Sequence, residues 1–379
     1  MKILHIGPLN VKTGGPTLST YLAMKGIERF GCETSILTMP LAAGDKWYAN
    51  DVKIYLTHNY TIPHYGYIPG YQHTLESLPQ HDIMHLQGLW MHLFHGGAKF
   101  ARKRDIPYVI SLRGNLYPQA LNNKKILKSI FRAKFQDTDL KNAACIHATS
   151  LDELKYYRDL GFKNPVAVIP NPINTDGLID QPLKSKTKFI IGYLGRLHPR
   201  KHVEKLIYAT DFLNRNNVEV TLRIIGSDDT NYENFLKSEV RRLRLKNIEF
   251  TGFLVDNEKD QAISELSVLA CVSDFENFGN IVTEALVRGV PVIATKGMPW
   301  KLLEEYSCGW WINNDQDTIN KTLFSVSSLS KAELQRMGTN GKKMIQELFS
   351  VDAIGEQFTE LYTWILEGGA APKFLDIVK

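Results

Sequence analysis

The stretch that decides the fold runs from residue 268 to residue 295 and reads VLACVSDFENFGNIVTEALVRGVPVIAT. Its first residues, 268–273, form an apolar run of strand length, and residues 291–295 form another that is rich in β-branched side chains. Between the two runs, an amphipathic segment that ends near Gly289 has the apolar spacing of a helix. A strand, a helix and a strand in this order predict a parallel βαβ unit.

The same alternation of short apolar runs and amphipathic segments covers most of the remaining chain. Further strands are expected at residues 2–7, 33–38, 52–57, 82–87, 107–112, 145–149, 166–169, 189–195, 219–226 and 248–252. The segment 171–188 is rich in Pro, Asn, Asp and Lys and is predicted to be a linker. We therefore expect an α/β protein with two doubly wound, Rossmann-like domains, 1–170 and 189–350, that face a central cleft. Residues 351–379 are expected to form a C-terminal helix that crosses the domain junction, followed by a tail.

The charge of the chain is unevenly distributed. Residues 1–150 contain 17 Lys and Arg against 9 Asp and Glu, whereas the rest of the 379-residue chain contains 28 against 31. The first half is therefore expected to meet a negatively charged partner. Nucleic acid is a poor candidate for that partner, because no recognition motif accompanies the charge.

Several classes of protein are disfavoured by the sequence. The four cysteines form no CxxC motif and no Cys/His cluster, which argues against a zinc site and against a disulfide scaffold. The N-terminus runs into a strand-like segment without a signal-peptide pattern, and no long stretch is apolar enough to span a bilayer. We expect a cytoplasmic protein, with peripheral contact to the inner face of a membrane left open.

The loop after the first strand of the quoted stretch carries its chemistry. Gly279 lets a ligand approach the backbone, and the N–H groups at the helix start form an anion site. The residues that supply these groups are Asn280, Ile281 and Val282. Glu276 precedes this site and Glu284 lies about two turns along the helix, so each carboxylate can bind a different set of hydroxyl groups. A nucleotide-sugar is an anion flanked by two polyhydroxyl groups, so these binding groups fit a nucleotide-sugar.

A second cluster, residues 195–201 with the sequence GRLHPRK, follows another expected strand. Arg196 offers a planar fork for phosphate oxygens, and Lys201 offers a charge on a flexible stem. Together they would offset the charge of a diphosphate leaving group without a metal. The alternative is a basic helix start, but cations are unfavourable at that end of a helix unless they meet an anion. Arg200 is a further cation in the same turn.

A third loop, residues 13–17 with the sequence TGGPT, follows the first strand of the chain. Pro16 suits the first turn of a helix, and Gly14 and Gly15 allow a ligand close to the N–H groups there. A tight turn would need the same residues. The spacing from Gly7 does not give the GxGxxG pattern, so no dinucleotide cofactor is expected.

With these motifs, the chain resembles the retaining glycosyltransferases of family 4, which have the GT-B fold. The Glu-x7-Glu motif of that family matches Glu276 and Glu284, and its Arg and Lys match Arg196 and Lys201. The resemblance implies that Glu276 contacts the donor sugar and Glu284 the ribose, while Arg196 and Lys201 bind the diphosphate. It covers nearly the whole chain and is most specific over residues 189–295.

The resemblance also implies the remaining donor contacts. The nucleobase is expected near Gly226 and Phe253, although both residues are equally consistent with ordinary strand ends. The other residues expected on the donor side are Gly14, Gly15, Phe278, Gly279, Asn280, Ile281 and Val282.

Candidates for the acceptor side come from the N-terminal half. His85 and the sequence Arg113-Gly114-Asn115 follow or end two expected strands, where ligand sites of α/β folds gather. Many family members have His-Gly where this chain has Arg113-Gly114, and the Arg version resembles a bacterial surface-polysaccharide subset. Arg113 is therefore a catalytic candidate that would stabilise a phosphate or an anionic acceptor, and Asn115 is an acceptor-side candidate. For His85, a position in the core remains an alternative.

The segment 122–135 contains five basic residues and no acidic one. Its isoleucine, leucine and phenylalanine residues recur at helical spacing, so such a helix could rest on an anionic bilayer with its apolar side down. The alternative is an ordinary domain helix whose apolar face is core and whose basic face is solvated. Both interpretations remain open at this point.

The sequence predicts a retaining, metal-independent glycosyltransferase without a cofactor, in the setting of surface polysaccharide assembly. It would move a sugar from a UDP- or GDP-linked donor to a hydroxyl of a saccharide or lipid-linked saccharide. Two alternatives stay open. A nucleotide-sugar epimerase or a phosphorolytic enzyme could use the same fold, and a non-catalytic subunit could bind the nucleotide-sugar without turnover. An oxidoreductase is disfavoured by the missing glycine fingerprint.

Overall fold

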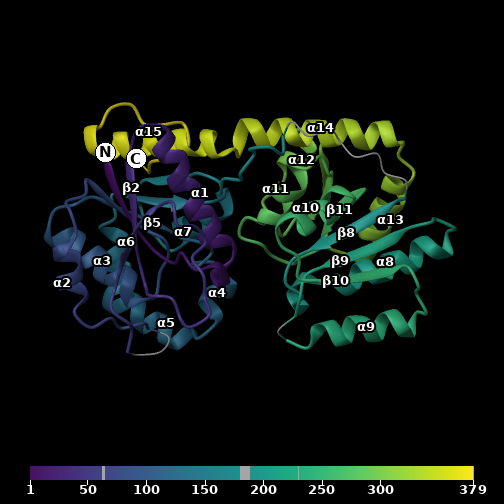
Figure 1. Cartoon of the computed structure of the whole chain (residues 1–379), viewed down its shortest axis with the longest axis horizontal. Coiled ribbons are helices and arrows are strands. Elements are labelled where there is room, and N and C mark those ends of the chain that lie inside the picture. Colours follow the sequence, from purple (N-terminus) through teal and green to yellow (C-terminus); the bar gives the residue numbers. More distant parts are fainter. Residues whose placement is uncertain (62–64, 180–187, 229, 379) are drawn as a thin grey trace. The chain divides into compact units, whose positions relative to one another are not determined.

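The computed structural model describes residues 1–61, 65–179, 188–228 and 230–378 (Figure 1). The chain divides into two compact units. Unit 1 contains Met1–Asn174 and Ser350–Lys379, and unit 2 contains Thr175–Phe349. Of the expected linker 171–188, residues 180–187 lie outside the described part of the chain.

Unit 1 is built on an eight-stranded sheet in the order β14-β7-β6-β5-β4-β1-β2-β3. Its strands are β1 (Lys2–Ile6), β2 (Glu33–Thr38), β3 (Lys53–Leu56), β4 (Ile83–Leu86), β5 (Tyr108–Ser111), β6 (Cys145–Ala148), β7 (Val166–Val168) and β14 (Leu375–Asp376). The first seven pair in parallel, as expected from the sequence, and β14 runs antiparallel to β7. The order reverses between β1 and β4, which is the switch point at which doubly wound sheets bind ligands.

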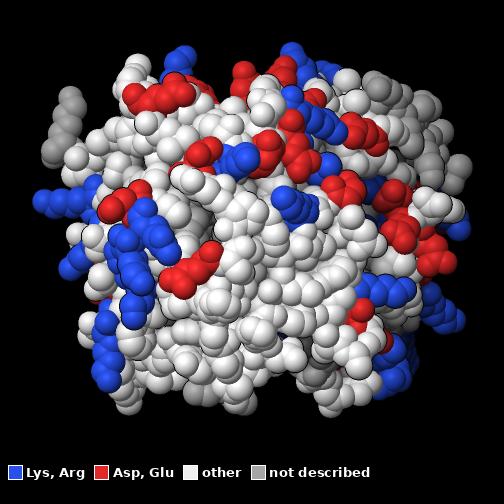
Figure 2. Space-filling view, turned by 60° about the vertical axis from the view of Figure 1, so that its left-hand side comes forward, with Lys and Arg blue, Asp and Glu red and all other residues white. Residues whose placement is uncertain are grey.

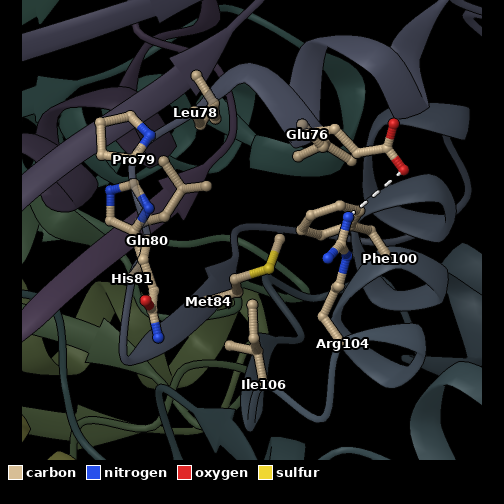
Figure 3. A pocket seen from close by; sticks show the side chains of 11 residues that line it. Glu76, Leu78, Pro79, Gln80, His81, Met84, Phe100, Arg104 and Ile106 are labelled. Atoms are coloured by element: carbon tan, nitrogen blue, oxygen red, sulfur yellow. Dashed lines mark ion pairs between the residues drawn. The ribbon is translucent and has the colours of Figure 1, made fainter.

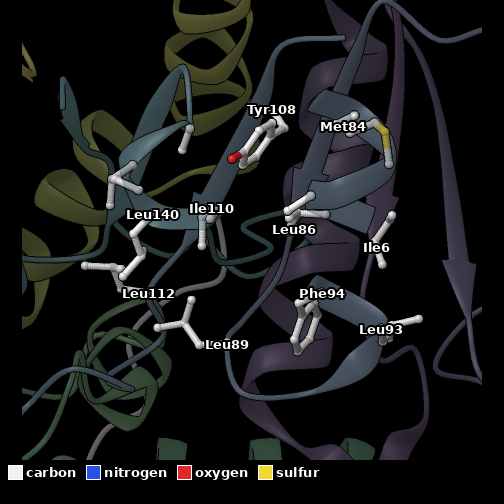
Figure 4. Close-up of a cluster of buried hydrophobic side chains, with 14 of the residues drawn as sticks. Ile6, Met84, Leu86, Leu89, Leu93, Phe94, Tyr108, Ile110, Leu112 and Leu140 are labelled. Carbon is white, nitrogen blue, oxygen red and sulfur yellow. The ribbon is translucent and has the colours of Figure 1, made fainter. Parts of the chain in front are cut away.

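The core of unit 1 lies on both faces of this sheet, because successive side chains of a strand point to opposite faces. Leu86 and Ile110 pack on one face with Phe94 of helix α3 (His92–Lys103), in the cluster of Figure 4. Val109 packs on the other face with Ile27 of helix α1 (Gly15–Arg29). The near-continuous apolar sequence of the strands follows from this two-sided burial.

The C-terminal helix α15 (Val351–Glu367) is part of unit 1. It packs on α1 so closely that a Cβ atom on Gly355 would lie 2.3 Å from the carbonyl carbon of Gly26. Phe358 and Leu361 of α15 are buried in the same cluster as the β1 and β5 side chains of that face. The predicted helix at residues 351–367 is confirmed, and its buried stripe explains its apolar spacing.

Unit 2 is built on a six-stranded parallel sheet in the order β10-β9-β8-β11-β12-β13. Its strands are β8 (Ile190–Leu194), β9 (Thr221–Ile225), β10 (Ile248–Gly252), β11 (Val268–Cys271), β12 (Val292–Thr295) and β13 (Gly309–Ile312). The order reverses between β8 and β11, which gives unit 2 its own switch point. Strand β13 was not predicted, since four residues with a glycine at the start carry little periodic signal.

The remaining helices are divided between the two units. In unit 1 they are α2 (Tyr71–Ser77), α4 (Pro118–Asn122), α5 (Lys125–Phe131), α6 (Asp137–Lys141) and α7 (Leu151–Asp159). In unit 2 they are α8 (Val203–Arg215), α9 (Tyr232–Arg242), α10 (Asp256–Ser264), α11 (Asn280–Leu286), α12 (Leu302–Glu305), α13 (Gln316–Ser327) and α14 (Lys331–Leu348). The helix expected at residues 122–135 is interrupted by a π-helical turn at Arg132–Gln136. No helix within the described ranges is both long enough and apolar enough to cross a bilayer.

Candidate functional site

Three of the predicted donor residues of unit 2, Arg196, Lys201 and Glu276, lie in the loops after β8 and β11, the two strands that flank the switch point. Arg196 follows β8 and is exposed, and Lys201 ends a short 3-10 turn at Pro199–Lys201. Glu276 lies in the loop that follows β11. Because adjacent parallel strands end at the same edge of a sheet, residues about 75 positions apart in the chain come together here.

An ion pair joins the two loops directly. Lys201 Nζ donates a hydrogen bond to Glu276 Oε1, and the two side chains are 22% and 17% exposed. Ser273 Oγ donates to the same carboxylate oxygen at 3.1 Å. A cation and a carboxylate therefore stand side by side at the strand ends, both within reach of solvent.

The loop that carries Glu276 is held in place by the loop that follows β12. The Glu276 N–H donates to the carbonyl of Gly297 at 3.1 Å, and Thr295 Oγ1 donates to the carbonyl of Ser273 at 2.5 Å. Gly297 is required there, because a Cβ atom on it would lie 1.9 Å from the carbonyl oxygen of Asp274. Sequence reasoning did not identify Gly297 as part of the site. A glycine directly after a buried strand is the signal that could have found it.

His202 forms a second connection between the segment that follows β8 and the loop that follows β11. Its Nε2 lies 2.5 Å from Asp274 Oδ2, and its Nδ1 lies 3.0 Å from Glu204 Oε1. Burial alone would lower the pKa of His202, but the hydrogen bonds to both carboxylates raise it above its ordinary value. Since a carboxylate only accepts, both contacts are hydrogen bonds when both ring nitrogens carry a proton, which is why the two carboxylates favour the protonated ring.

The start of α11 differs from the sequence prediction in two respects. Gly279 has a left-handed φ of 83°, as a close approach of backbone and ligand requires, but the N–H of Val282 already donates to the Gly279 carbonyl at 2.9 Å. The expected three free amides are therefore not all free. The ring of Phe278 is buried against Trp300, with ring centroids 5.1 Å apart, so this donor-side candidate is a packing residue. Asn280 and Ile281 are half-buried at the helix start.

Glu284, expected to bind ribose hydroxyls, forms an ion pair that the sequence did not reveal. Lys259 Nζ of α10 lies 2.9 Å from Glu284 Oε2. The pair joins residues on two helices, α10 and α11, and no local sequence pattern marks such a contact. Lys259 is therefore placed to orient the Glu284 carboxylate.

Gly226 and Phe253 lie at the ends of neighbouring strands of unit 2. The Gly226 N–H donates to the carbonyl of Gly252 at 2.9 Å, and a Cβ atom on Gly226 would lie 1.9 Å from the carbonyl oxygen of Gly195. Gly226 thus allows the ends of β8, β9 and β10 to meet. Phe253 follows β10 and is 74% exposed, which leaves its ring face open.

In unit 1, Gly14 directly precedes α1 and Gly15 is the first residue of that helix. Gly14 adopts a left-handed φ of 72° at the N-cap of α1, and apart from Gly14 and its two chain neighbours no atom of the described residues lies within 4 Å of the position that a Cβ would take. The backbone before this 15-residue helix is thus exposed at the carboxyl end of β1. This placement agrees with the expected approach of a ligand.

Arg113 holds the carboxyl edge of the unit 1 sheet together. Its terminal nitrogens donate four hydrogen bonds, to Ser19 Oγ (2.8 Å), Thr20 Oγ1 (3.1 Å), Gln87 Oε1 (2.7 Å) and Asn171 Oδ1 (2.9 Å). Burial lowers the pKa of Arg113 to about 10, while the Glu153 carboxylate acts in the opposite direction. The guanidinium group remains charged at neutral pH, and its hydrogen bonds make it a structural hub rather than an exposed group ready for substrate.

His85 is a core residue, which decides between the two interpretations of the sequence. It is 1% exposed, and both ring nitrogens are engaged, so direct contact with an acceptor is excluded by its burial. The Tyr362 hydroxyl lies 2.7 Å from its Nδ1, and Ser111 Oγ lies 2.8 Å from its Nε2. Asn115 is half-buried and donates to the carbonyl of Leu112 at 2.7 Å, which closes the turn after β5.

The buried histidines of unit 1 form a chain of hydrogen bonds with one direction. The carbonyl of Ile169 can only accept, so His147 Nε2 donates to it at 2.8 Å and His147 Nδ1 must accept from Ser111. Ser111 Oγ then accepts from His85 Nε2, and His85 Nδ1 accepts from Tyr362. Burial lowers the pKa of both imidazoles, so each is neutral, and this neutrality gives the chain its single direction. Burial lowers the pKa of His147 to about 3, and Arg113 acts in the same direction.

A cavity of about 370 Å³ in unit 1 lies away from the carboxyl edge (Figure 3). It is lined by Leu78, Pro79 and Met84 near the amino end of β4 and by Arg104, which pairs with Glu76 at 3.7 Å. No predicted site residue lines it.

Within the described ranges, no group of three or more His, Cys, Asp or Glu residues is arranged to hold a metal ion.

Two family models match the chain, one in each unit. The model described as glycosyl transferase 4-like domain matches residues 14–172. The model described as glycosyl transferases group 1 matches residues 175–344. The second match contains the loops of Lys201 and Glu276.

A curated relative with a named activity is the poly(ribitol-phosphate) alpha-N-acetylglucosaminyltransferase of Staphylococcus aureus (strain COL). It is 24% identical over 188 residues, which are 48% of this chain and 36% of the relative. Three other curated relatives are aligned over 22%, 46% and 47% of their own lengths. The chain thus spans less than half the length of each of these four relatives.

Two solved structures share the fold of the whole chain. Sucrose-phosphate synthase from Thermosynechococcus elongatus has a TM-score of 0.75 at 18% identity, over 97% of this chain and 100% of that one. The HepE protein of Anabaena, solved in complex with UDP, has a TM-score of 0.73 at 18% identity, over 96% and 100%. With two doubly wound units, both family models and the paired Lys201 and Glu276 in agreement, the chain belongs to glycosyltransferase family 4 and has the GT-B fold.

Proposed function

We propose that the protein is a retaining, metal-independent glycosyltransferase that uses a nucleoside-diphosphate sugar as donor. The observation that carries the proposal is the ion pair of Lys201 and Glu276 at the switch point of unit 2, with Arg196 exposed on the same loop as Lys201. A sugar diphosphate presents anionic oxygens beside hydroxyl groups. Cations beside a carboxylate complement both groups, because the cations bind the anionic oxygens and the carboxylate accepts hydrogen bonds from the hydroxyl groups.

Each residue then has a defined role in the proposed reaction. Arg196 and Lys201 bind the diphosphate and stabilise the charge that develops as the bond to the sugar breaks, a task for which one preorganised donor is worth about a hundredfold or more in rate. Glu276 accepts hydrogen bonds from the sugar, and Glu284 accepts them from the ribose. The acceptor hydroxyl attacks from the face that the diphosphate leaves, and a phosphate oxygen takes its proton. No protein nucleophile is required.

The acceptor is proposed to be a saccharide or a lipid-linked saccharide in surface polysaccharide assembly. The basic excess of residues 1–150 favours an acceptor that carries negative charge. The Staphylococcus aureus relative is named for poly(ribitol-phosphate), a phosphate-bearing acceptor, and the Anabaena neighbour was solved with UDP. The UDP of the Anabaena structure supports UDP as the first donor nucleotide to try, with GDP as the second.

The proposal is tested with three substitutions and one matched control. Glu276→Gln, Arg196→Ala and Lys201→Ala should each lower sugar transfer about a hundredfold or more. Arg200→Ala removes an exposed cation of the same turn and should retain activity. Binding of UDP and GDP is measured first by thermal shift, and release of nucleotide from the matching sugar donors is then followed with and without saccharide acceptors. A chelator should leave the rate unchanged.

The possible outcomes separate the alternatives. Donor turnover that needs no saccharide acceptor would identify an epimerase, and dependence on free phosphate would identify a phosphorolytic enzyme. Nucleotide binding without any turnover would identify a non-catalytic subunit. Full transfer activity in Glu276→Gln would refute the proposed role of that carboxylate, and loss of transfer on chelation would refute metal independence.

A further inference from the structure

Helix α5 presents an apolar surface to solvent. Ile126, Leu127 and Ile130 are 80%, 47% and 48% exposed, and no residue of α4 or α5 is buried. Three large aliphatic side chains in a row of five residues are costly to leave in water. A surface of this kind in a folded protein marks a site of contact with another body.

Ile126, Leu127 and Ile130 do not lie on the side of the helix that faces the core. Phe131 and Phe135 fill that role, with ring centroids 5.3 and 6.4 Å from the ring of Tyr65, and Phe135 also packs on His95 at 4.9 Å. The helical segment thus has one apolar side that attaches it to unit 1 and another that remains uncovered. The second side has no function in folding.

The uncovered apolar residues are surrounded by cations. Lys124, Lys125 and Lys134 are exposed, and no carboxylate pairs with them among the described residues. Two other cations of the segment are already used, since Arg132 pairs with Asp137 at 2.9 Å and Lys128 donates to the carbonyl of Ala120. Residues 122–136 contain no acidic side chain.

The positive charge of this segment is a local property. The face drawn in Figure 2 mixes acidic and basic side chains and has a broad area with neither. The net charge of the chain therefore does not make every surface basic. The combination of unpaired lysines with exposed aliphatic residues belongs to α5 and the turn that follows it.

We propose that α5 docks on an anionic lipid bilayer, with Ile126, Leu127 and Ile130 entering the interface between headgroups and acyl chains. Lys124, Lys125 and Lys134 would then contact lipid phosphates, in the manner of an interfacial amphipathic helix. Docking of this surface does not depend on the proposed transferase activity, because it uses no residue of the donor site.

Charge and size favour a bilayer over a second copy of the chain. Two copies of this lysine-rich surface would repel each other, whereas an anionic membrane attracts it. Three aliphatic side chains also offer far less area than the roughly 800 Å² per partner of a stable protein interface. Partial insertion into a bilayer needs no such area, because each inserted side chain leaves water independently.

The test is flotation of the purified full-length protein with vesicles of phosphatidylcholine alone or mixed with phosphatidylglycerol. We expect binding only to the mixed vesicles, and a weaker interaction as salt rises. Lys124→Gln combined with Lys125→Gln should weaken binding about twenty-fivefold, since each lysine near an anionic surface contributes about fivefold. Ile126→Ser combined with Ile130→Ser should weaken it by about tenfold or more.

Two matched controls separate the local surface from net charge and from general hydrophobicity. Lys321→Gln combined with Lys343→Gln removes the same charge from exposed helices of unit 2, and Leu151→Ser removes an aliphatic side chain that is 71% exposed on α7. Both should bind like the wild type. Glu276→Gln should also bind like the wild type, so that failure of the transferase proposal stays distinguishable from failure of this one.

Four results would overturn the proposal. These are absence of binding to mixed vesicles, equal binding to neutral vesicles, unchanged binding of both α5 variants, and equal weakening in the unit 2 control. Sedimentation that reveals a dimer abolished by Ile126→Ser with Ile130→Ser would identify a second copy as the occupant instead. Thermal melting of each variant verifies the fold, and substitutions at such exposed positions should leave it unchanged.

Discussion

Lowering the pH from about 7.5 to about 5.5 should destabilise unit 1, because His5, His85 and His147 are buried there as neutral imidazoles. In the unfolded chain these side chains bind a proton as the pH falls through 6.5, their ordinary pKa. In the folded chain they do not, since burial, with Arg113 acting in the same direction, lowers the pKa of His5 and of His147 to about 3. Stability is therefore present above pH 6.5 and is lost as the pH falls toward 3.

The magnitude follows from the size of these shifts. Each pH unit below 6.5 costs about 1.4 kcal/mol per histidine until the folded-state pKa is reached. At about pH 5.5, His5 and His147 together lower the free energy of unfolding by about 3 kcal/mol. His85, whose pKa burial lowers well below 6.5, adds a loss of the same sign. Glu153 acts in the opposite direction, because burial raises its pKa.

The assay compares the wild type with variants, so that contributions from other groups cancel. The free energy of unfolding of unit 1 is measured from the urea dependence of hydrogen exchange in β4 and β6 peptides, which keeps unit 2 out of the result. His147→Gln should reduce the pH-dependent loss by about 1.4 kcal/mol, whatever its effect on absolute stability. His5→Gln serves the same purpose if the first variant does not fold.

A control lies on α2, where His73 is exposed, and His73→Gln should leave the pH-dependent loss unchanged. The reasoning fails if His147→Gln and His5→Gln both lose as much stability as the wild type between the two pH values. It also fails if His73→Gln reduces the loss by a similar amount. The first result would mean that the buried histidines take up protons in the folded state, and the second that the loss does not arise from burial.

Two further predictions concern close packing and the donor site. Gly355→Ala should destabilise unit 1 by about 1–3 kcal/mol in urea unfolding, because the new Cβ would overlap the backbone of Gly26. Helix propensity alone predicts that the same substitution stabilises the unit by about 1 kcal/mol. The sign of the measured change therefore decides between close packing and helix propensity. Lys259→Ala should weaken nucleoside-diphosphate binding several-fold in titration calorimetry, because Glu284 loses the partner that orients it. Lys237→Ala removes the matched ion pair with Glu233 on α9 and should not change the affinity. Equal affinity in both variants would contradict a role for Lys259 in orienting Glu284 for binding.

The sequence predicted most of the fold because its strongest signals are local. Both faces of the strands are buried, so each strand is a short apolar run that can be read without knowledge of its neighbours. The two strands that were not predicted, β13 and β14, have four and two residues and lie at sheet edges. The break of the expected 122–135 helix at a π-helical turn was missed for a different reason. It depends on tertiary contacts such as the one from the Trp90 N–H to Gln136 Oε1.

The site was predicted only as far as motifs mark it. Residues Arg196, Lys201, Glu276 and Glu284 stand where the strand ends place them, next to the switch point. The sequence could not show that Lys201 pairs with Glu276, that Lys259 pairs with Glu284, or that Gly297 holds the Glu276 loop. Each of these contacts joins segments that are distant along the chain.

The sequence by itself therefore determined the alternation of strands and helices, the two sheets that it implies, and the loops at which charged residues gather. The tertiary structure decided which of these residues face solvent. It placed His85 in the core and left the aliphatic side of α5 uncovered, although both patterns were equally compatible with the opposite outcome. The physical reason is that burial depends on what the other elements cover, and a periodic apolar pattern is the same whether its partner is the protein core or another surface.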